Sequence, residues 1–241
     1  MTDLDTARAT KTFISDLPSR FMLDGATYAK GGELGYDGLD FYVAGRAGTL
    51  GRQPADVIAA ALVFFAPATV RDYWDRASQV GEPTAAGAAF AACGHAWGEA
   101  HLGDGPDHAR CAALLERVAA AANPASAPLF AAWRALPAPA GPKARVLHFA
   151  NALRELRGAL HGGAILTHGV PPAAAVQLKS PHMAALFGWT DPIPGLEAYQ
   201  AAWDLADAAT DVALAPTFAV LDDTEQAELV SLCEQELASA S

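Results

Sequence analysis

Apolar residues recur at spacings of three and four along almost the whole chain. Alanine, leucine, valine and phenylalanine occupy most of these positions, and prolines stand where the first turns of helices are expected. The alternation of apolar and polar residues that marks strands is nearly absent. The pattern therefore predicts an all-α, compact multi-helix fold. The predicted helices cover residues 5–17, 54–65, 67–80, 83–102, 107–122, 127–136, 143–168, 172–179, 194–212 and 223–239.

Two segments interrupt this helical pattern. Residues 24–52 contain eight glycines, and each glycine costs a helix interior about 1 kcal/mol, so a long loop or lid is predicted there. Residues 123–142 contain five prolines, which predicts a short helix followed by a linker. A domain boundary near residue 140 follows, with a helical N-terminal domain at 1–140 and a helical C-terminal domain at 141–241.

The charge is unevenly distributed along a chain that is 52% hydrophobic and has a formal net charge of −11. Residues 1–179 balance sixteen acidic against sixteen basic side chains, whereas residues 180–241 contain eleven Asp or Glu and no Lys or Arg. The apolar content is enough for a packed core and argues against disorder. The acidic quarter cannot release counterions from a phosphate backbone or dock on anionic lipid, so neither nucleic acid nor membrane is an expected partner.

Targeting and redox signals favour a cytoplasmic protein. The first residues are acidic where a signal peptide is basic, and the longest apolar run, residues 57–70, is too short to span a bilayer. The three cysteines form no CxxC pair, and an odd number is typical of reduced thiols and not of a disulfide framework.

A glycine-rich segment at residues 42–51 is the first candidate for ligand binding. Gly45, Gly48 and Gly51 surround Arg46, so the backbone can approach a ligand and present N–H groups to an anion. The spacing is not that of a dinucleotide-binding motif. The alternative is a structural turn in which Arg46 caps a carbonyl or pairs with a carboxylate.

The long helix predicted at 143–168 is the second candidate. Its polar side chains fall within one arc of about 120°, and they are Asn151, Arg154, Arg157, His161 and His168. Gly158, Gly162 and Gly163 thin the helix beside His161, which is costly unless something packs closely there. The face either lines a pocket or is solvated.

A third group, His95, Glu99 and His101, is a weak metal candidate. His95 and Glu99 are four residues apart on one helix, but the spacing matches no established metal motif. Surface histidines are the alternative. Neither a nucleophile motif nor a phosphate-binding loop is present, so the sequence leaves open whether the protein is an enzyme, and the cofactor is unknown.

Several segments carry a family resemblance. They are YVAGRAGTLG, VIAAALVFFAPATV, RELRGALHGGAIL, GWTD and ATDVALAP, followed by an acidic terminal helix. In order and spacing, residues 40–240 resemble the SalK/EvbL-like family, which implies a fold related to the winged helix-turn-helix. The positions that match its two main motifs are Tyr42, Gly45, Arg46, Leu50, Gly51, Arg154, Glu155, Arg157, Gly158 and His161. The positions that depart from them are Gly48, Thr49, Leu156, Ala159 and Leu160.

The largest departure from the family pattern concerns DNA recognition. Between Trp189 and Thr210 the sequence predicts a turn and one helix, without room for a wing. Recognition helices need cations and amides, yet this region has no Lys or Arg and only Gln200 as an amide. We therefore expect a degenerate winged-helix-like C-terminal part without a clear wing.

The leading hypothesis is a small-molecule-binding cytoplasmic protein. Its pocket would lie between the Gly-Arg segment and the Arg/His helix face, and guanidinium groups there favour an anionic or carbonyl-bearing ligand. The predicted ligand-binding residues are Tyr42, Gly45, Arg46, Gly48, Gly51, Asn151, Arg154 and Arg157. His161 is the candidate acid or base if a reaction occurs.

Three alternatives stay open beside it. One is a winged helix-turn-helix transcriptional regulator, and another is a metal- or haem-dependent enzyme that uses His95, His101 or His161. The third is a partner-binding role, because the apolar residues of the acidic helix 223–239 suit docking on its own core or on a second subunit. A homodimer would follow from the latter.

Overall fold

The computed structural model describes all residues from 1 to 241 and contains helices but no strands, which confirms the all-α prediction. The α helices are α1 (Asp3–Met22), α2 (Gly25–Glu33), α3 (Leu39–Ala47), α4 (Ala55–Ala61), α5 (Pro67–Val80), α6 (Pro83–His101), α7 (His108–Ala121), α8 (Pro128–Arg134), α9 (Pro142–Thr167), α10 (Pro172–Lys179), α11 (Gln200–Leu214) and α12 (Asp223–Ser239). Four short 3-10 helices lie at Gly48–Leu50, Pro181–Met183, Leu196–Tyr199 and Ala215–Val220. None of the helices is long and apolar enough to cross a membrane.

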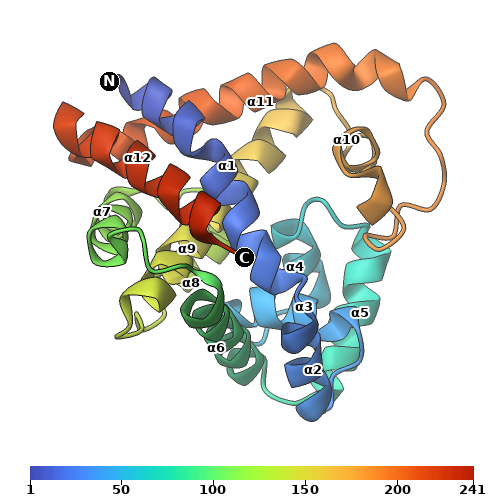
Figure 1. The fold of residues 1–241 in the computed structure, drawn as a ribbon. Coiled ribbons are helices and arrows are strands. Elements are labelled where there is room, and N and C mark those ends of the chain that lie inside the picture. The colour runs from blue at the N-terminus through green and yellow to red at the C-terminus, as the bar shows by residue number, and fades with distance from the viewer.

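Helix α9 is the central element of the fold (Figure 1). It packs against α1, α6, α7, α8 and α11, which surround it. Its middle is buried on all sides, because even Asn151 and Glu155 are only 1% and 2% exposed. The solvated face left open by the sequence is therefore wrong for this part of the helix.

One main hydrophobic core joins most of the helices. It contains 50 buried residues, which run from Ala7 in α1 to Cys233 in α12. A second cluster of five buried residues packs α10 against α9 and α11. The core thus takes residues from both sides of position 140. As predicted, a short helix, α8, and a non-helical segment precede α9. The division into domains 1–140 and 141–241 stays a prediction.

Residues 24–52 are helical, so the predicted long loop is wrong. The segment forms α2, α3 and a 3-10 turn, and its glycines allow close packing between helices. A Cβ at Gly31 would lie 2.7 Å from Cδ1 of Phe41, and one at Gly45 would lie 2.4 Å from Cγ of Phe90. Tertiary packing therefore outweighs the low helix propensity of glycine here.

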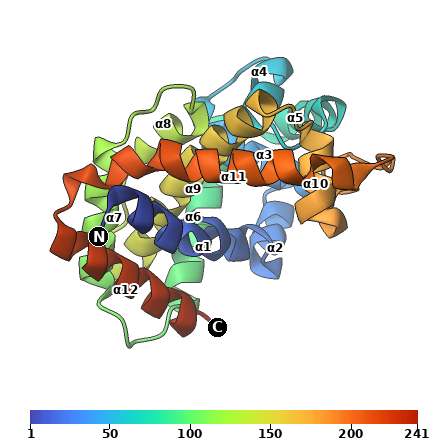
Figure 2. The ribbon, with the colours of Figure 1, turned by 90° about the horizontal axis from the view of Figure 1, so that it is seen from above.

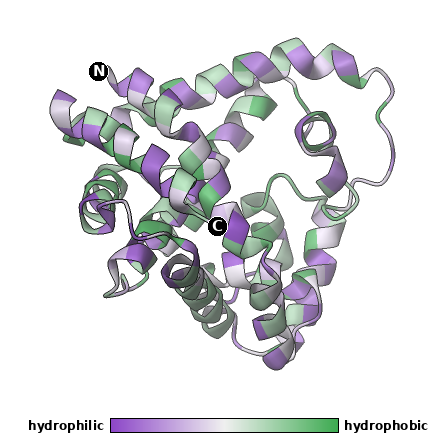
Figure 3. Ribbon diagram, viewed as in Figure 1, coloured by the Kyte–Doolittle hydropathy of each residue, from purple (hydrophilic) through white to green (hydrophobic).

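The acidic C-terminal quarter packs on basic residues of the rest of the chain. Hydrophilic and hydrophobic residues alternate along α11 and α12 (Figure 3), and α11 lies against α1 and α9 (Figure 2). Arg110 of α7 contacts Glu228 of α12 at 2.7 Å, and Nδ1 of His108 lies 2.7 Å from Glu236. Lys11 of α1 pairs with Asp207 of α11. These contacts therefore neutralise part of the −11 charge that residues 180–241 contribute.

Candidate ligand pocket

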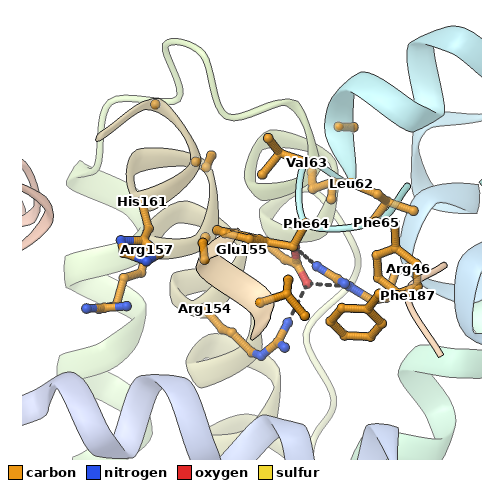
Figure 4. A pocket seen from close by; sticks show the side chains of 18 of the residues that line it. Arg46, Leu62, Val63, Phe64, Phe65, Arg154, Glu155, Arg157, His161 and Phe187 are labelled. Carbon is orange, nitrogen blue, oxygen red and sulfur yellow. Dashed lines mark hydrogen bonds and ion pairs between the residues drawn. The ribbon is translucent and has the colours of Figure 1, made fainter. Parts of the chain in front are cut away.

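A cavity of about 450 Å³ lies beside the C-terminal half of α9, and it is bordered by the segment after α4, by α10 and by α11. Figure 4 shows the cavity with the segment that follows α4 on one side and α9 on the other. Its apolar walls are formed by Leu62, Val63, Phe64, Phe65, Leu129, Val176, Phe187 and Trp203. The volume and the apolar lining are typical of small-molecule sites.

The glycines of α9 shape this cavity. Gly158, Gly162 and Gly163 line it. A Cβ at Gly162 would lie 2.6 Å from Cγ1 of Val63, so this glycine allows the segment after α4 to approach the helix. A Cβ at Gly158 or Gly163 would meet nothing within 4 Å, so these two leave space open. The thinning of the helix that the sequence shows thus has a structural reason.

Arg46 and Glu155 form a buried ion pair at one end of the cavity. Nε and Nη2 of Arg46 donate to the two carboxylate oxygens at 3.0 and 2.8 Å, and Nη1 donates to the hydroxyl of Tyr42 at 3.0 Å. Burial alone would raise the pKa of Glu155, but the charges of Arg46 and Arg154 hold it below its ordinary value. Glu155 is therefore ionised, and it fixes the guanidinium of Arg46.

Arg154 and Arg157 differ in how firmly they are held. Nη1 of Arg154 has one contact, 3.3 Å from Glu155, which leaves most of its guanidinium free at the cavity. Nη2 of Arg157 donates to Asp207 at 3.1 Å and lies 3.6 Å from Asp211. Nε of Arg157 is buried without a hydrogen-bond partner. Arg154 is thus the freer of the two cations.

His161 lies between two aromatic rings at the other end of the cavity. Its ring stacks on Phe64 at 5.6 Å between centroids and meets Trp203 edge to face at 5.7 Å. Nδ1 lies 2.9 Å from the hydroxyl of Thr210. Burial and the charge of Arg157 lower the pKa of His161 to about 4. The imidazole is therefore neutral near pH 7.

Half of the predicted ligand-binding residues line the cavity and half do not. Tyr42, Arg46, Arg154 and Arg157 line it, together with the candidate base His161. The residues outside the lining are Gly45, Gly48, Gly51 and Asn151. Gly48 packs on the carbonyl oxygen of Pro83, and Asn151 is buried with both amide atoms unpaired.

The sequence alone does not assign a ligand-binding role to most of the lining residues, among them Glu155, Phe64 and Trp203. Glu155 pairs with a residue 109 positions away. Phe64 reaches His161 from the turn after α4, and Trp203 reaches it from α11. The spacing of residues along the sequence cannot predict these contacts, because they join different elements. Glu155 does, however, lie within the family motif.

The weak metal candidates point to different partners. Nε2 of His95 faces Nδ1 of His148 at 3.3 Å, a carboxylate oxygen of Glu99 accepts from the backbone N–H of Ala144, and Nδ1 of His101 lies 2.7 Å from the carbonyl of Ser241. The structure contains no group of three or more His, Cys, Asp or Glu residues arranged to hold a metal ion. The three residues therefore do not form one site.

A model of a helix-turn-helix family matches residues 7–240. The chain belongs to this helix-turn-helix family. No curated protein and no solved structure matches the chain. The match covers nearly the whole chain and confirms the helix-turn-helix part of the resemblance. The more specific SalK/EvbL-like assignment stays a prediction.

Proposed function

We propose that this helix-turn-helix family member binds a small organic anion with an apolar body in the cavity beside α9. The observation that carries the proposal is the lining of the cavity, which combines aromatic walls with an excess of cations. Arg46, Arg154, Arg157 and Lys179 line it against one carboxylate, that of Glu155.

The contacts of these cations assign them different roles. Arg46 is held on three nitrogens by Glu155 and Tyr42, so it acts as a positioning residue. Arg154 retains free donors. Nζ of Lys179 lies 3.9 Å from the ring centre of Trp203 and also faces the cavity. Charge-assisted hydrogen bonds to carboxylates are strongest where water is excluded, so we expect the ligand's anionic group at Arg154.

The test is a fluorescence titration with 8-anilino-1-naphthalenesulfonate, an anion with an aromatic body. We expect saturable binding at one site. Gly158→Leu places a side chain in open cavity space, so binding should weaken at least about tenfold, roughly 1.4 kcal/mol. Gly32→Leu is the matched control, because Gly32 is an exposed helical glycine in α2 whose Cβ would also meet nothing within 4 Å.

Arg154→Gln provides the second arm of this test, because it removes the charge and keeps a polar, though shorter, side chain. It should weaken binding of the sulfonate while leaving thermal unfolding close to the parent value. Equal affinity in the parent, Gly158→Leu and Arg154→Gln proteins would show that the dye binds elsewhere, and the proposal would be wrong.

A transcriptional regulator is the second candidate, and the family match supports it. The charges oppose it, because twelve of the sixteen Lys and Arg residues lie within ion-pair distance of a carboxylate. The other four are Arg8, Arg20, Arg134 and Lys179. Fluorescence anisotropy with mixed-sequence duplex DNA at low salt distinguishes the two: binding that weakens steeply as salt rises would favour the regulator.

A further inference from the structure

The hydrogen bonds of Thr210 fix which nitrogen of His161 carries the proton. The hydroxyl of Thr210 has a single proton, and it donates to the carbonyl of Ala206 at 2.7 Å in the preceding helical turn. With its proton placed on that carbonyl, the same hydroxyl oxygen accepts from Nδ1 of His161, 2.9 Å away. We assign the proton of the neutral ring to Nδ1 on this network.

The other ring nitrogen is then a hydrogen-bond acceptor. Nε2 of His161 makes no hydrogen bond within the protein, and the residue lines the cavity. Arg157 packs beside the ring, and its charge opposes a second proton there. A ligand that displaces water from such an acceptor binds most tightly when it supplies a donor of its own.

We propose that the ligand is a hydroxylated organic anion, which places its anionic group at Arg154 and donates its hydroxyl proton to Nε2 of His161. This inference rests on the proposed function and narrows the ligand class. A carbonyl oxygen at the same place would face the lone pair of Nε2 and has no proton to give, so the carbonyl-bearing ligand expected from the sequence is disfavoured at His161.

The spacing of Arg154 and His161 along α9 guides the choice of probe ligands. Arg154 and His161 are seven residues apart on α9, so their Cα atoms are separated by about 10.5 Å along the helix axis. Phe64 and Trp203 present ring surfaces beside His161, and aromatic groups pack favourably on such rings. An aromatic ring that carries the hydroxyl, joined through a short chain to a carboxylate, fits these positions.

The experiment compares three carboxylates by isothermal titration calorimetry. The probes are 3-(4-hydroxyphenyl)propionate, its 4-methoxy analogue and 3-phenylpropionate. The methoxy compound keeps an oxygen at the same position but has no proton to donate. We expect the hydroxylated probe to bind about tenfold more tightly than either analogue, as one well-made hydrogen bond allows.

Two variants test the role of His161. His161→Phe keeps an aromatic ring between Phe64 and Trp203 but removes Nε2, so the three probes should bind within about twofold of one another. Thr210→Val removes the acceptor that holds the proton on Nδ1, and Thr210→Ser retains it. We expect the preference for the hydroxyl to fall in Thr210→Val and to persist in Thr210→Ser.

The outcomes separate the two proposals. If the parent protein binds all three probes equally, and Gly158→Leu weakens all three, the pocket binds anions and the assignment of a hydroxyl to His161 is overturned. A preference for the hydroxylated probe that survives in His161→Phe also overturns the assignment. If none of the probes binds and the sulfonate dye does not bind either, the proposed function fails and this inference fails with it.

Discussion

Removing Arg46 should leave a buried charge behind. In Arg46→Met the carboxylate of Glu155, which is 2% exposed, loses both hydrogen bonds to the guanidinium and retains only the 3.3 Å contact with Arg154. Loss of one partner of a buried pair destabilises proteins by about 3–5 kcal/mol. The variant should therefore unfold far more readily than the parent protein.

Protonation of Glu155 limits this loss and makes it depend on pH. A carboxyl group with an ordinary pKa of 4.5 can be neutralised at pH 7 for about 3.4 kcal/mol, at 1.36 kcal/mol for each pH unit. The parent protein lowers this pKa, so the pair's contribution is fully present above pH 4.5 and is lost only as the pH falls through the folded-state pKa. In Arg46→Met the cost of protonating Glu155 falls with each pH unit below 7, so the difference in unfolding free energy between the parent and the variant should shrink steadily from pH 7 toward pH 4.5.

Urea denaturation at pH 7, 6 and 5 measures this difference. Arg52→Met is the matched control, because Arg52 pairs with Glu82 at a similar distance, 2.9 Å, but with side chains that are 57% and 71% exposed. It should cost less than about 1 kcal/mol at every pH. Adding Glu155→Gln to Arg46→Met should restore most of the stability at pH 7. A loss in Arg46→Met that is as small as in Arg52→Met, or that does not vary with pH, would refute the reasoning.

Two further predictions concern the packed interior. Burial, with His95 and Arg145 nearby, lowers the pKa of His148 to about 4 from 6.5, so the unfolded chain takes up the proton first. Stability should fall by about 3 kcal/mol from this group as the pH drops from 6.5 to 4, and His148→Phe should flatten that slope in urea denaturation. Gly45→Ala should lower the unfolding free energy by about 1–3 kcal/mol, because its Cβ would lie 2.4 Å from Cγ of Phe90; a melting temperature at or above that of the parent would contradict this.

The sequence predicts the helices well wherever apolar periodicity sets the fold. It fails at residues 24–52, because local propensity counts each glycine as a loss and cannot include what lies opposite it. Gly31 and Gly45 are needed where Phe41 and Phe90 approach. Such contacts join residues that are far apart in sequence, so they become visible only in the folded structure.

The candidate site was predicted in part for a similar reason. Arg154, Arg157 and His161 share one side of a helix, and helical spacing alone groups them. The partners of Arg157 and His161 lie on another element, because Asp207 and Thr210 come from α11. Glu155, which contacts Arg154 on α9, is held by Arg46 from α3. The sequence left open whether Arg46 contacts a ligand or a carboxylate, and the bidentate pair with Glu155 supports the second alternative.

The charge distribution acquires a different meaning once the chain is folded. Asp207 and Asp211 belong to the acidic quarter that opposes DNA binding in the sequence, yet both face Arg157 beside the cavity. They neutralise and orient this arginine while Arg154 stays largely free, so a protein of charge −11 can still present a cationic pocket. Ion pairs of this kind also engage most of the other Lys and Arg residues with carboxylates of the same chain. A phosphate backbone would have to displace many of those carboxylates to be bound. An organic anion in the cavity instead meets the donors that Arg154 keeps free beside its one 3.3 Å contact with Glu155.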